Sequence, residues 1–436
     1  MTGLYDHLFR SVGPSALNFV SGYQAYLRQL RQTQFLPREE LRRRQEERLK
    51  LLCEYAFRHV PLFKKLGGTP DFGDPVELPI LSKSVLRRHL RLAISEREAR
   101  MHRRRGLTSG TSGAPLEFWT DRRSDGLRLA ARYLFDEWIG LPFGSRIARI
   151  VARPNRFSRL LANELRIPLD SVNSKTAAGV LERIFRFQPE GIIGQPYSLG
   201  LLAEAKTNIR PNFSKTLHCI VATAETLLES ERAAIEETFE CSLYNRYGLR
   251  EISGYVAQEC RAQEGLHVNV GHVMVEIVDN GRAGADGKPG RIIVTDLHNR
   301  VMPFIRYDTE DVGVLLNEPC SCGVTWPLLK IIQGRQSDYV IIKDGARVPL
   351  SIFVDSFLHS FAGRIAQVQF VQRREGSTIV RIVPEKRFTS DDMVKVRDYF
   401  SRLLSRFDLE LVHDLPVAKS GKRPLLIRET RDQTTL

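Results

Sequence analysis

The chain has no long apolar run and few cysteines. Within its 436 residues, no apolar stretch approaches the about 20 residues that a membrane-spanning helix requires. The N-terminal residues do not combine a positively charged segment with an apolar core, so we expect neither a secretory signal nor insertion into a membrane. These absences predict a cytoplasmic location. In that compartment the six cysteines are expected to be free thiols or metal ligands rather than disulfides.

Nucleic-acid-binding motifs are also missing, although the formal net charge is +14. The chain has no zinc-finger spacing, no basic region followed by heptads and no aromatic RNA-binding signature. One arginine cluster, at residues 41–44, is flanked by glutamates, which is typical of a solvated helix face with ion pairs. A second cluster, at residues 100–105, precedes a candidate phosphate loop, where positive potential would attract a polyphosphate. We expect no nucleic-acid partner.

The length indicates two or three domains, each able to form its own core. Residues 1–100 are predicted to be mainly helical, because apolar residues recur at helical spacing before a break at Pro61. From residue 107 onward, short apolar runs alternate with helical stretches, which is typical of an α/β fold. The expected strands are residues 147–151, 191–194, 217–222 and 290–296, and the expected helices are residues 124–138 and 227–238.

The C-terminal part is predicted to be a separate unit. A polar, glycine-rich turn at residues 279–290 connects two apolar runs and predicts a hairpin near the end of the first domain. A new unit follows Gly334, with enough residues for a small α+β domain. Its expected strands are residues 339–342, 366–372 and 378–383, and its expected helices are residues 351–360 and 391–404. We therefore predict an N-terminal α/β domain at residues 1–334, with a helical lead-in at 1–100, and a C-terminal domain at 335–436.

A loop rich in hydroxyl groups, residues 107–115, is the most informative segment of the chain. Four Ser or Thr residues and two glycines lie between apolar Leu107 and Pro115. Glycine allows the backbone to approach an anion closely, while hydroxyls and successive N–H groups supply donors, so the loop is predicted to hold phosphate. The usual nucleotide P-loop has a lysine after its last glycine, whereas Ala114 follows Gly113 here. An ordinary surface linker is the alternative.

Three further clusters have a similar chemical character. Residues 222–226 end a strand-like run before a helix, where open α/β sheets bind ligands. Residues 245–251 combine an aromatic ring able to stack on a base with a carboxylate able to hold Mg²⁺. Residues 305–311 place acidic groups beside an arginine, and a polar segment at 333–338 follows. Each cluster is weak by itself.

In this order and spacing, the four segments resemble the adenylate-forming superfamily of acyl-CoA synthetases. The most similar branch is that of phenylacetate-CoA ligases and their capsule-biosynthesis relatives, which residues 55–61 and 78–83 also resemble. The resemblance implies ATP-dependent activation of a carboxylic acid, in some relatives aromatic, to an acyl-adenylate with release of pyrophosphate. It also implies transfer to a thiol such as coenzyme A. A carrier protein or an amine as acceptor, a noncatalytic nucleotide-binding protein, and a homodimer are open alternatives.

The resemblance assigns the ATP-binding residues one by one. Asp311 corresponds to the aspartate that holds the ribose hydroxyls, and Tyr247 to the residue that stacks on the base. Three residues correspond to the segment that lines the adenine: Ala224, Glu225 and Thr226. Six residues correspond to the loop that holds the β- and γ-phosphates: Thr108, Ser109, Gly110, Thr111, Ser112 and Gly113.

The catalytic residues follow from the same resemblance. Glu251 corresponds to the Mg²⁺-binding glutamate, and Arg335 to the arginine that contacts the nucleotide before the hinge. Lys422 corresponds to the catalytic lysine of a small, mobile C-terminal lid domain, with Lys419 as a weaker candidate. The hinge is expected near residues 335–338.

Three residues depart from the family pattern. Arg250 replaces a threonine before the glutamate, and Asp308 replaces an arginine in the ribose motif. One hypothesis is that these two residues compensate each other as a pair. Ser337 stands where an aspartate is common at the hinge.

Four residues form a candidate zinc site. Nitrogen and sulfur ligands of this kind suit tetrahedral Zn²⁺, and relatives in the resembling branch carry a similar cluster, which implies a structural rather than a catalytic metal. Free thiols beside a hairpin are the alternative. The proposed ligands are Cys260, His267, Cys320 and Cys322.

Overall fold

The computed structural model of the chain describes most of the N-terminal part and the framework of the C-terminal part. The described residues are 13–19, 22–65, 78–98, 103–108, 116–151, 163–172, 175–209, 216–252, 254–279, 282–283, 287–316, 318–333, 339–341, 343, 347–349, 357–358, 360–361, 364–373, 377–415 and 425–428.

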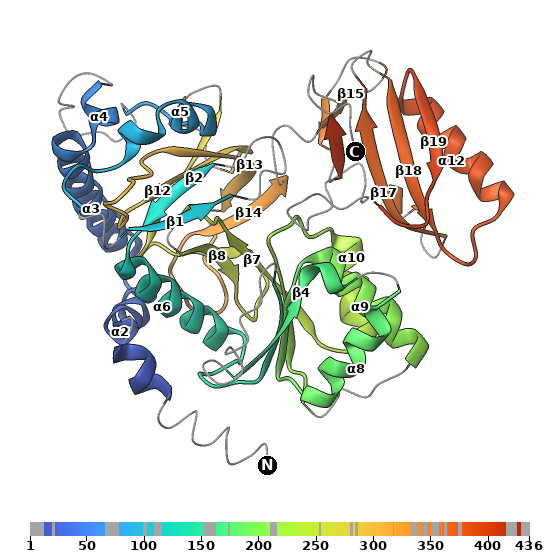
Figure 1. The fold of residues 1–436 in the computed structure, drawn as a ribbon, viewed down its shortest axis with the longest axis horizontal. Coiled ribbons are helices and arrows are strands. Elements are labelled where there is room, and N and C mark those ends of the chain that lie inside the picture. The colour runs from blue at the N-terminus through green and yellow to red at the C-terminus, as the bar shows by residue number, and fades with distance from the viewer. Residues whose placement is uncertain are drawn as a thin grey trace.

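A mixed sheet of 12 strands forms the centre of the N-terminal part (Figure 1). Its parallel half contains the strands that alternate with helices along the chain, as the α/β pattern predicts. Isoleucine and valine recur in the three middle strands of this half, at residues 147–151, 191–194 and 219–223, where both faces of the sheet are covered. In sheet order the parallel strands are β4 (Glu164–Pro168), β3 (Ile147–Val151), β5 (Gly191–Gly194), β6 (Cys219–Thr223) and β7 (Ser242–Gly248).

The other half of the sheet is antiparallel and continues from β7. The predicted hairpin at residues 279–290 is confirmed, because the strands on either side of that turn pair antiparallel from Val273↔Asp296 to Val278↔Arg291. In sheet order these strands are β8 (Tyr255–Glu259), β9 (Leu266–Val268), β14 (Leu328–Gln333), β13 (Tyr307–Leu316), β12 (Gly290–Asp296), β10 (Val273–Asp279) and β11 (Arg282–Ala283).

Helices cover the sheet with their apolar faces. One core cluster joins the parallel strands to three helices that lie together in Figure 1: α8 (Ala177–Phe187), α9 (Pro196–Ile209) and α10 (Glu229–Phe239). Helix α6 (Arg122–Trp138) contributes to other core clusters and begins at Asp121, whose side chain accepts a hydrogen bond from the Ser124 amide at 2.9 Å. The two helices predicted at residues 124–138 and 227–238 are therefore confirmed within two residues at each end.

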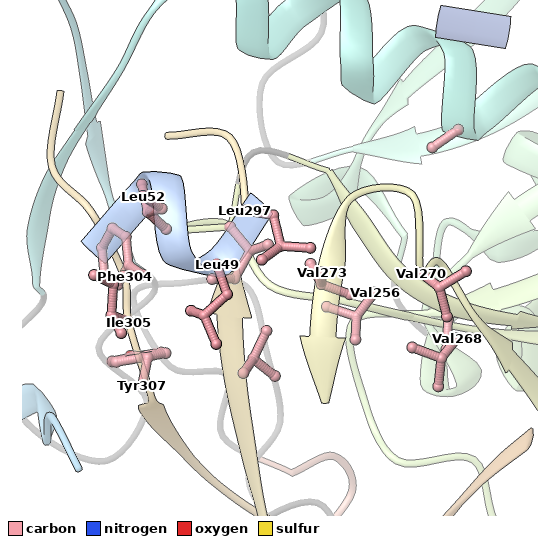
Figure 2. Packing of buried hydrophobic residues seen from close by; sticks show 14 of the residues in the cluster. Leu49, Leu52, Val256, Val268, Val270, Val273, Leu297, Phe304, Ile305 and Tyr307 are labelled. Carbon is pink, nitrogen blue, oxygen red and sulfur yellow. The ribbon is translucent and has the colours of Figure 1, made fainter. Parts of the chain in front are cut away.

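The helical lead-in packs on the antiparallel half. It comprises α2 (Tyr23–Thr33), α3 (Arg38–His59), α4 (Pro61–Lys65), α5 (Lys83–Arg88) and the 3-10 helix η2 (Leu90–Ala93), with a break between α3 and α4 as Pro61 predicts. Figure 2 shows Leu49 and Leu52 of α3 against Leu297, Phe304 and Tyr307, all of them buried. The lead-in therefore covers the end of β13 that carries the acidic motif. A short two-stranded sheet lies nearby and is formed by β1 (Arg104–Leu107) and β2 (Glu117–Thr120).

The C-terminal residues form a separate small sheet (Figure 1), and the apolar core on it also includes Leu228 of the N-terminal part. Helix α12 (Ser390–Leu403) packs on it through Val396 and Phe400, and the helix predicted at residues 351–360 lies largely outside the described residues. The four strands run in the order β19 (Phe407–Leu411), β18 (Thr378–Pro384), β17 (Ile365–Gln372) and β20 (Leu426–Arg428), and a two-stranded sheet contains β15 (Tyr339–Ile341) and β16 (Arg347–Pro349). The predicted fold class, a large α/β part followed by a small α+β part, is confirmed.

No helix in the described parts of the chain is both long and apolar enough to cross a membrane.

Candidate active site

The phosphate loop begins at a short hairpin. Thr108 closes the β1–β2 pair, because its amide donates to the Leu116 carbonyl at 2.9 Å and its Oγ1 accepts from the Leu116 amide at 2.8 Å. Residues 109–115, which include five of the predicted phosphate-binding residues, lie outside the described residues. The hairpin therefore positions the first residue of the predicted loop.

The adenine segment follows β6 at the edge of the sheet where the parallel strands end. Ala224 has a φ of 72°, an uncommon conformation for a residue with a side chain, and residues of this kind concentrate at ligand sites. The Thr223 hydroxyl donates to the Arg246 carbonyl at 2.9 Å and ties the end of β6 to β7. Ala224, Glu225 and Thr226 thus occupy the position where open α/β sheets bind ligands.

Two strands bring the predicted base-stacking residue to the predicted ribose residue. The Tyr247 hydroxyl, on β7, donates to Asp311 Oδ2, on β13, at 2.6 Å. Burial, followed by the negative charge of Asp311, raises the pKa of Tyr247 well above its usual value, so the phenol keeps its proton and remains a donor. A neighbouring residue holds the backbone at Asp311, because the Asp311 amide donates a hydrogen bond to Thr309 Oγ1 at 3.1 Å. Two residues that are 64 positions apart therefore meet at one site.

A second tyrosine holds the predicted magnesium ligand. The Tyr307 hydroxyl donates to Glu251 Oε1 at 2.6 Å, and Tyr307 is fully buried while Glu251 is 4% exposed. Burial and the Glu251 carboxylate raise the pKa of the Tyr307 phenol, so this hydroxyl also remains a donor. One carboxylate oxygen is thus oriented by the protein. A carboxylate held in this way fits a hard cation such as Mg²⁺, which prefers oxygen ligands.

An upstream segment supports the acidic motif from the other side. The Leu81 amide donates to the Arg306 carbonyl at 2.9 Å, and the Asp308 amide donates to the Leu81 carbonyl at 2.9 Å. Arg306, whose φ is 48°, donates from Nη1 to the Leu78 carbonyl at 2.6 Å. The segment at residues 78–83 therefore docks beside the start of β13.

Arg250 and Asp308, two of the three residues that depart from the family pattern, do not contact each other. The hypothesis that they compensate each other as a pair is therefore wrong. Asp308 Oδ2 instead accepts from Arg291 Nη1 at 2.6 Å, because β12 places this arginine beside β13. Arg250 Nη1 donates to the Leu107 carbonyl at 3.2 Å, next to the phosphate loop. Arg250 thereby links the residues after β7 to the end of β1, where the predicted phosphate loop begins.

The arginine clusters are largely ion-paired. On α3 the pairs are the ones expected for a solvated helix face, with Arg43 and Arg44 both contacting Glu40. In the second cluster, Arg105 contacts Glu117 at 2.7 Å and Arg104 contacts Asp125. Both clusters therefore belong to the surface framework, and exposed pairs of this kind contribute little to stability.

The four predicted zinc ligands converge. Their ligand atoms all lie within 4.8 Å of one another, with Cys260 Sγ 3.6 Å from Cys320 Sγ and Cys322 Sγ 3.3 Å from His267 Nε2. His267 Nδ1 lies 3.2 Å from the Trp326 carbonyl, which leaves Nε2 facing the sulfur atoms. This donor set of three sulfurs and one nitrogen fits Zn²⁺ in a closed, tetrahedral site. All six cysteines lie within the described ranges and none of them forms a disulfide.

The surroundings of the cluster join three parts of the fold. The turn after Cys320 closes through the Gly323 amide, which donates to the Cys320 carbonyl at 3.2 Å. Glu264 accepts from the Ser321 amide at 2.8 Å, which joins the β8–β9 turn to this loop. Thr325 Oγ1 donates to the Leu36 carbonyl at 2.6 Å, at the junction of α2 and α3. The cluster thus sits where the helical lead-in meets the sheet.

Several predicted residues cannot be placed. Arg335, Lys419, Lys422 and the hinge residues 335–338 lie outside the described residues, as do Ser109, Gly110, Thr111, Ser112 and Gly113.

The structure adds residues that sequence reasoning missed. Tyr307 stands in a motif that the sequence had singled out, but its role as the partner of Glu251 depends on a contact across 56 residues. Arg291 lies on a strand with no motif. A group of buried arginines around α6 also escaped attention, because Arg132, Arg149 and Arg246 are far apart in the sequence.

Comparisons with known proteins point to one family and one fold. A phenylacetate-coenzyme A ligase from Thermus thermophilus is 30% identical over 385 residues, which cover 78% of this chain and 80% of that protein. Protein CapK of Staphylococcus aureus is 22% identical over 371 residues, 81% of this chain and 80% of CapK. The crystal structure of a 2-hydroxyisobutyryl-CoA ligase in the postadenylation state, in complex with R3-HIB-AMP, matches with a TM-score of 0.77 at 18% identity and covers 91% of each chain. A comparison with protein-family models finds no match.

The fold, with its 12-stranded sheet and small C-terminal sheet, is that of the adenylate-forming acid–CoA ligases. Within that class the chain belongs to the phenylacetate-coenzyme A ligase family.

Proposed function

We propose that the protein is an AMP-forming ligase that activates a carboxylic acid with ATP and transfers the acyl group to the thiol of coenzyme A. The observation that carries this proposal is the convergence of Tyr247–Asp311 and Tyr307–Glu251 at the carboxyl edge of the parallel strands. The two pairs match a nucleotide pocket in which one carboxylate faces ribose and the other faces a cation. The family membership supports the same reaction.

The chemistry explains why these residues are needed. A carboxylate must attack the α-phosphorus of ATP, so two anions approach each other while pyrophosphate leaves. Asp311 and Tyr247 bind the nucleoside, and the loop at residues 108–113 grips the phosphates. Glu251 would hold Mg²⁺, which offsets charge on the phosphate oxygens when bound. Arg335 would contact the nucleotide as the two parts of the chain close on it.

The C-terminal part acts in this proposal as a lid. Its sheet is separate from the N-terminal one, and the apolar core on that sheet consists of residues between Phe357 and Leu426, joined by Leu228 of the N-terminal part. This arrangement supports a small second unit. The domains would be residues 1–334 and 335–436, with a hinge near 335–338. Rotation of a small domain would bring Lys422 to the α-phosphate during adenylation and remove it during thioester formation.

Zinc is the second cofactor in the proposal. Cys260, His267, Cys320 and Cys322 supply four ligands, so no position remains open for a substrate or a water. The role is therefore structural: the metal would join the turn after β8 to the loop between β13 and β14.

A screen of carboxylic acids for ATP-dependent pyrophosphate release tests the function. We expect release that depends on the acid, followed by a coenzyme A thioester when coenzyme A is present. Omitting coenzyme A and supplying an amine or a phosphopantetheinylated carrier protein tests the other acceptors. Nucleotide binding without acid-dependent release across the panel would indicate a noncatalytic protein and contradict the proposal.

Replacing Lys422 with alanine should separate the two half-reactions. Loss of a positive charge that stabilises the transition state is expected to lower adenylation by about 10²-fold. Thioester formation from a preformed acyl-adenylate should stay close to the wild-type rate. The matched control is Lys419→Ala, which removes the same charge three residues away. Equal effects of both substitutions on adenylation, or no effect of either, would show that Lys422 is not the catalytic lysine.

A further inference from the structure

A group of arginines lines one face of the parallel sheet beneath α6. This group, the arginine basin, consists of Arg132 of α6, Arg149 of β3, Arg166 of β4 and Arg246 of β7. Arg149 and Arg166 are direct neighbours in the β3–β4 register. Of the four, only Arg246 lies in a segment that the family resemblance uses, residues 245–251, and the resemblance gives it no role.

The basin carries more positive than negative charge. Glu164 accepts from Arg149 at 3.2 Å and from Arg166 at 2.8 Å, and it also contacts Arg132. Burial alone would raise the pKa of the Glu164 carboxyl, but these three arginines outweigh it and hold the pKa at about 2. Asp136, which contacts Arg132 and Arg246, is the other carboxylate. Among the described residues, four guanidinium groups thus face two carboxylates.

Two guanidinium nitrogens in the basin have no acceptor among the described residues. They are Nη1 of Arg246, which is 1% exposed, and Nη2 of Arg149. A buried N–H group without a partner is costly, and a charged one more so. The other nitrogens of Arg246 are bound to Asp136 and Gln258, so the side chain cannot turn away to find a partner. Two such atoms beside an excess of positive charge are able to donate hydrogen bonds to an anionic group.

The positive charge of the arginine basin acts on Tyr255. The Arg246 guanidinium lies 4.9 Å from the centre of the Tyr255 ring, and Tyr255 is partly exposed. Burial would raise the pKa of its phenol, but Arg149, Arg246 and Arg132 outweigh this effect and lower the pKa. The same three guanidinium groups therefore act on the Tyr255 phenol.

The basin adjoins the nucleotide residues. A Cβ added to Gly248 would lie 3.1 Å from Tyr255 Cδ1, so the Tyr255 ring packs directly on the residue that follows Tyr247. Arg149 and Arg246 each stand two residues before the end of a parallel strand, at the edge where α/β sheets bind ligands. The basin is thus within reach of a small substrate bound beside the ATP site.

We propose that Arg149 and Arg246, together with Tyr255, bind a second anionic group carried by the acid that the enzyme activates. Arg132 and Arg166 are instead ion-paired to the carboxylates of the basin, Asp136 and Glu164. This inference rests on the proposed function and narrows its substrate to acids with a further carboxylate, sulfonate or phosphonate. One anionic group is adenylated. The other accepts hydrogen bonds from the free guanidinium nitrogens.

Matched acids test the proposal. Acid-dependent pyrophosphate release is measured for phenylacetate and for its 4-carboxy, 4-sulfo and 4-phosphono derivatives, which differ in one group. A charge-assisted hydrogen bond corresponds to about 10-fold to 100-fold in affinity. We therefore expect kcat/KM for at least one dianionic acid to exceed that for phenylacetate by about tenfold or more. Equal or higher kcat/KM for phenylacetate would overturn the inference, and this comparison needs only the wild-type protein.

A pair of variants separates recognition from structure. Arg149→Met removes a contact to Glu164 and also removes Nη2, the nitrogen that has no acceptor among the described residues. Arg166→Gln also removes a contact to Glu164, but Arg166 is not among the arginines that lower the pKa of Tyr255. Arg149→Met should lower kcat/KM for the dianionic acid by about tenfold and leave that for phenylacetate unchanged, while Arg166→Gln affects neither. Equal losses for both acids would show a structural role only.

Direct binding distinguishes failure of this inference from failure of the proposed function. Calorimetry with 4-carboxyphenylacetate and phenylacetate does not depend on turnover. If no acid releases pyrophosphate, the proposed function fails; selective binding of the dicarboxylate that Arg149→Met abolishes would still support the anion site. Absence of that selectivity overturns it.

Discussion

Replacing Glu251 with glutamine should lower adenylation by about 10³-fold, the upper range for losing one electrostatic contribution to a phosphoryl-transfer transition state. Glutamine preserves the shape of the side chain, and its amide oxygen can still accept the hydrogen bond that Tyr307 donates at 2.6 Å. The negative charge that would hold Mg²⁺ is lost. Folding should therefore be retained while metal-dependent chemistry is not.

The measurement is acid-dependent pyrophosphate release over a series of Mg²⁺ concentrations. Thermal unfolding of the variant serves as the control, because Glu251 is buried and a folding defect would also abolish activity. If a folded Glu251→Gln protein adenylates at the wild-type rate, Glu251 is not the Mg²⁺ ligand.

Tyr307→Phe should lower adenylation less than Glu251→Gln does, because it keeps the carboxylate and removes only the hydrogen bond that orients it. The ring would keep its contact with Phe304, 5.2 Å between centroids, while the carboxylate loses one orienting hydrogen bond. A lost hydrogen bond to a charged group corresponds to about 1.5–3 kcal/mol, so we expect a loss of about tenfold or more in adenylation. Higher Mg²⁺ should restore part of it, since the ligand remains but is less well oriented. A purely structural role would instead lower the unfolding temperature without changing the Mg²⁺ dependence.

The sequence predicted which segments contribute to the site more reliably than it predicted the contacts between their side chains. Apolar periodicity predicted several strands and helices of the N-terminal part, among them β3, β5, β12 and α6, and Ala224 follows the end of β6 as expected. Asp311, by contrast, lies inside β13. The two tyrosine–carboxylate contacts could not be predicted, because each depends on how β7 and β13 are placed across a sheet with three strands between them.

Register explains the error over Asp308. Its neighbour in the sheet is Ile293, and the nearby cation on that strand is Arg291, which no motif distinguishes. The hypothesis of compensation with Arg250 used only the fact that both residues depart from the family pattern. Chemical complementarity in a sequence does not specify distance, whereas the pairing of β12 with β13 does.

For the four candidate zinc ligands, unlike Asp308 and Arg250, the sequence predicted correctly which residues lie together. Cys260 and His267 flank the β8–β9 turn, while Cys320 and Cys322 lie 60 and 55 residues from their contact partners, Cys260 and His267 respectively. The pairing of β14 with β9 brings the two halves together. Ligand chemistry predicted that these four residues would meet, and their ligand atoms do lie within 4.8 Å of one another, even though the spacing between the halves is uninformative.

Removal of zinc should destabilise the N-terminal part by at least about 3 kcal/mol, since loss of a structural metal is among the few single changes with effects of that size. Without the metal, two buried thiols, the exposed thiol of Cys322 and a buried imidazole would lie together without a ligand, beside Trp138, whose ring centroid lies 5.3 Å from that of His267. The loop after β13 would lose its attachment to β8, and the Thr325 contact with Leu36 would weaken with it. We expect about one zinc per chain by metal analysis and a lower unfolding temperature after chelation.

Cys320→Ser should reproduce this effect, because a serine hydroxyl is a poor zinc ligand compared with a thiolate. Cys241→Ser is the control, since Cys241 is partly buried in a different core cluster and also replaces sulfur with oxygen. Hydrogen exchange should increase first at β9 and in the loop between β13 and β14, where the ligands lie, before the parallel half opens. Absence of zinc from the purified protein, together with equal stability of the two variants, would instead identify the four residues as free thiols and a structural histidine.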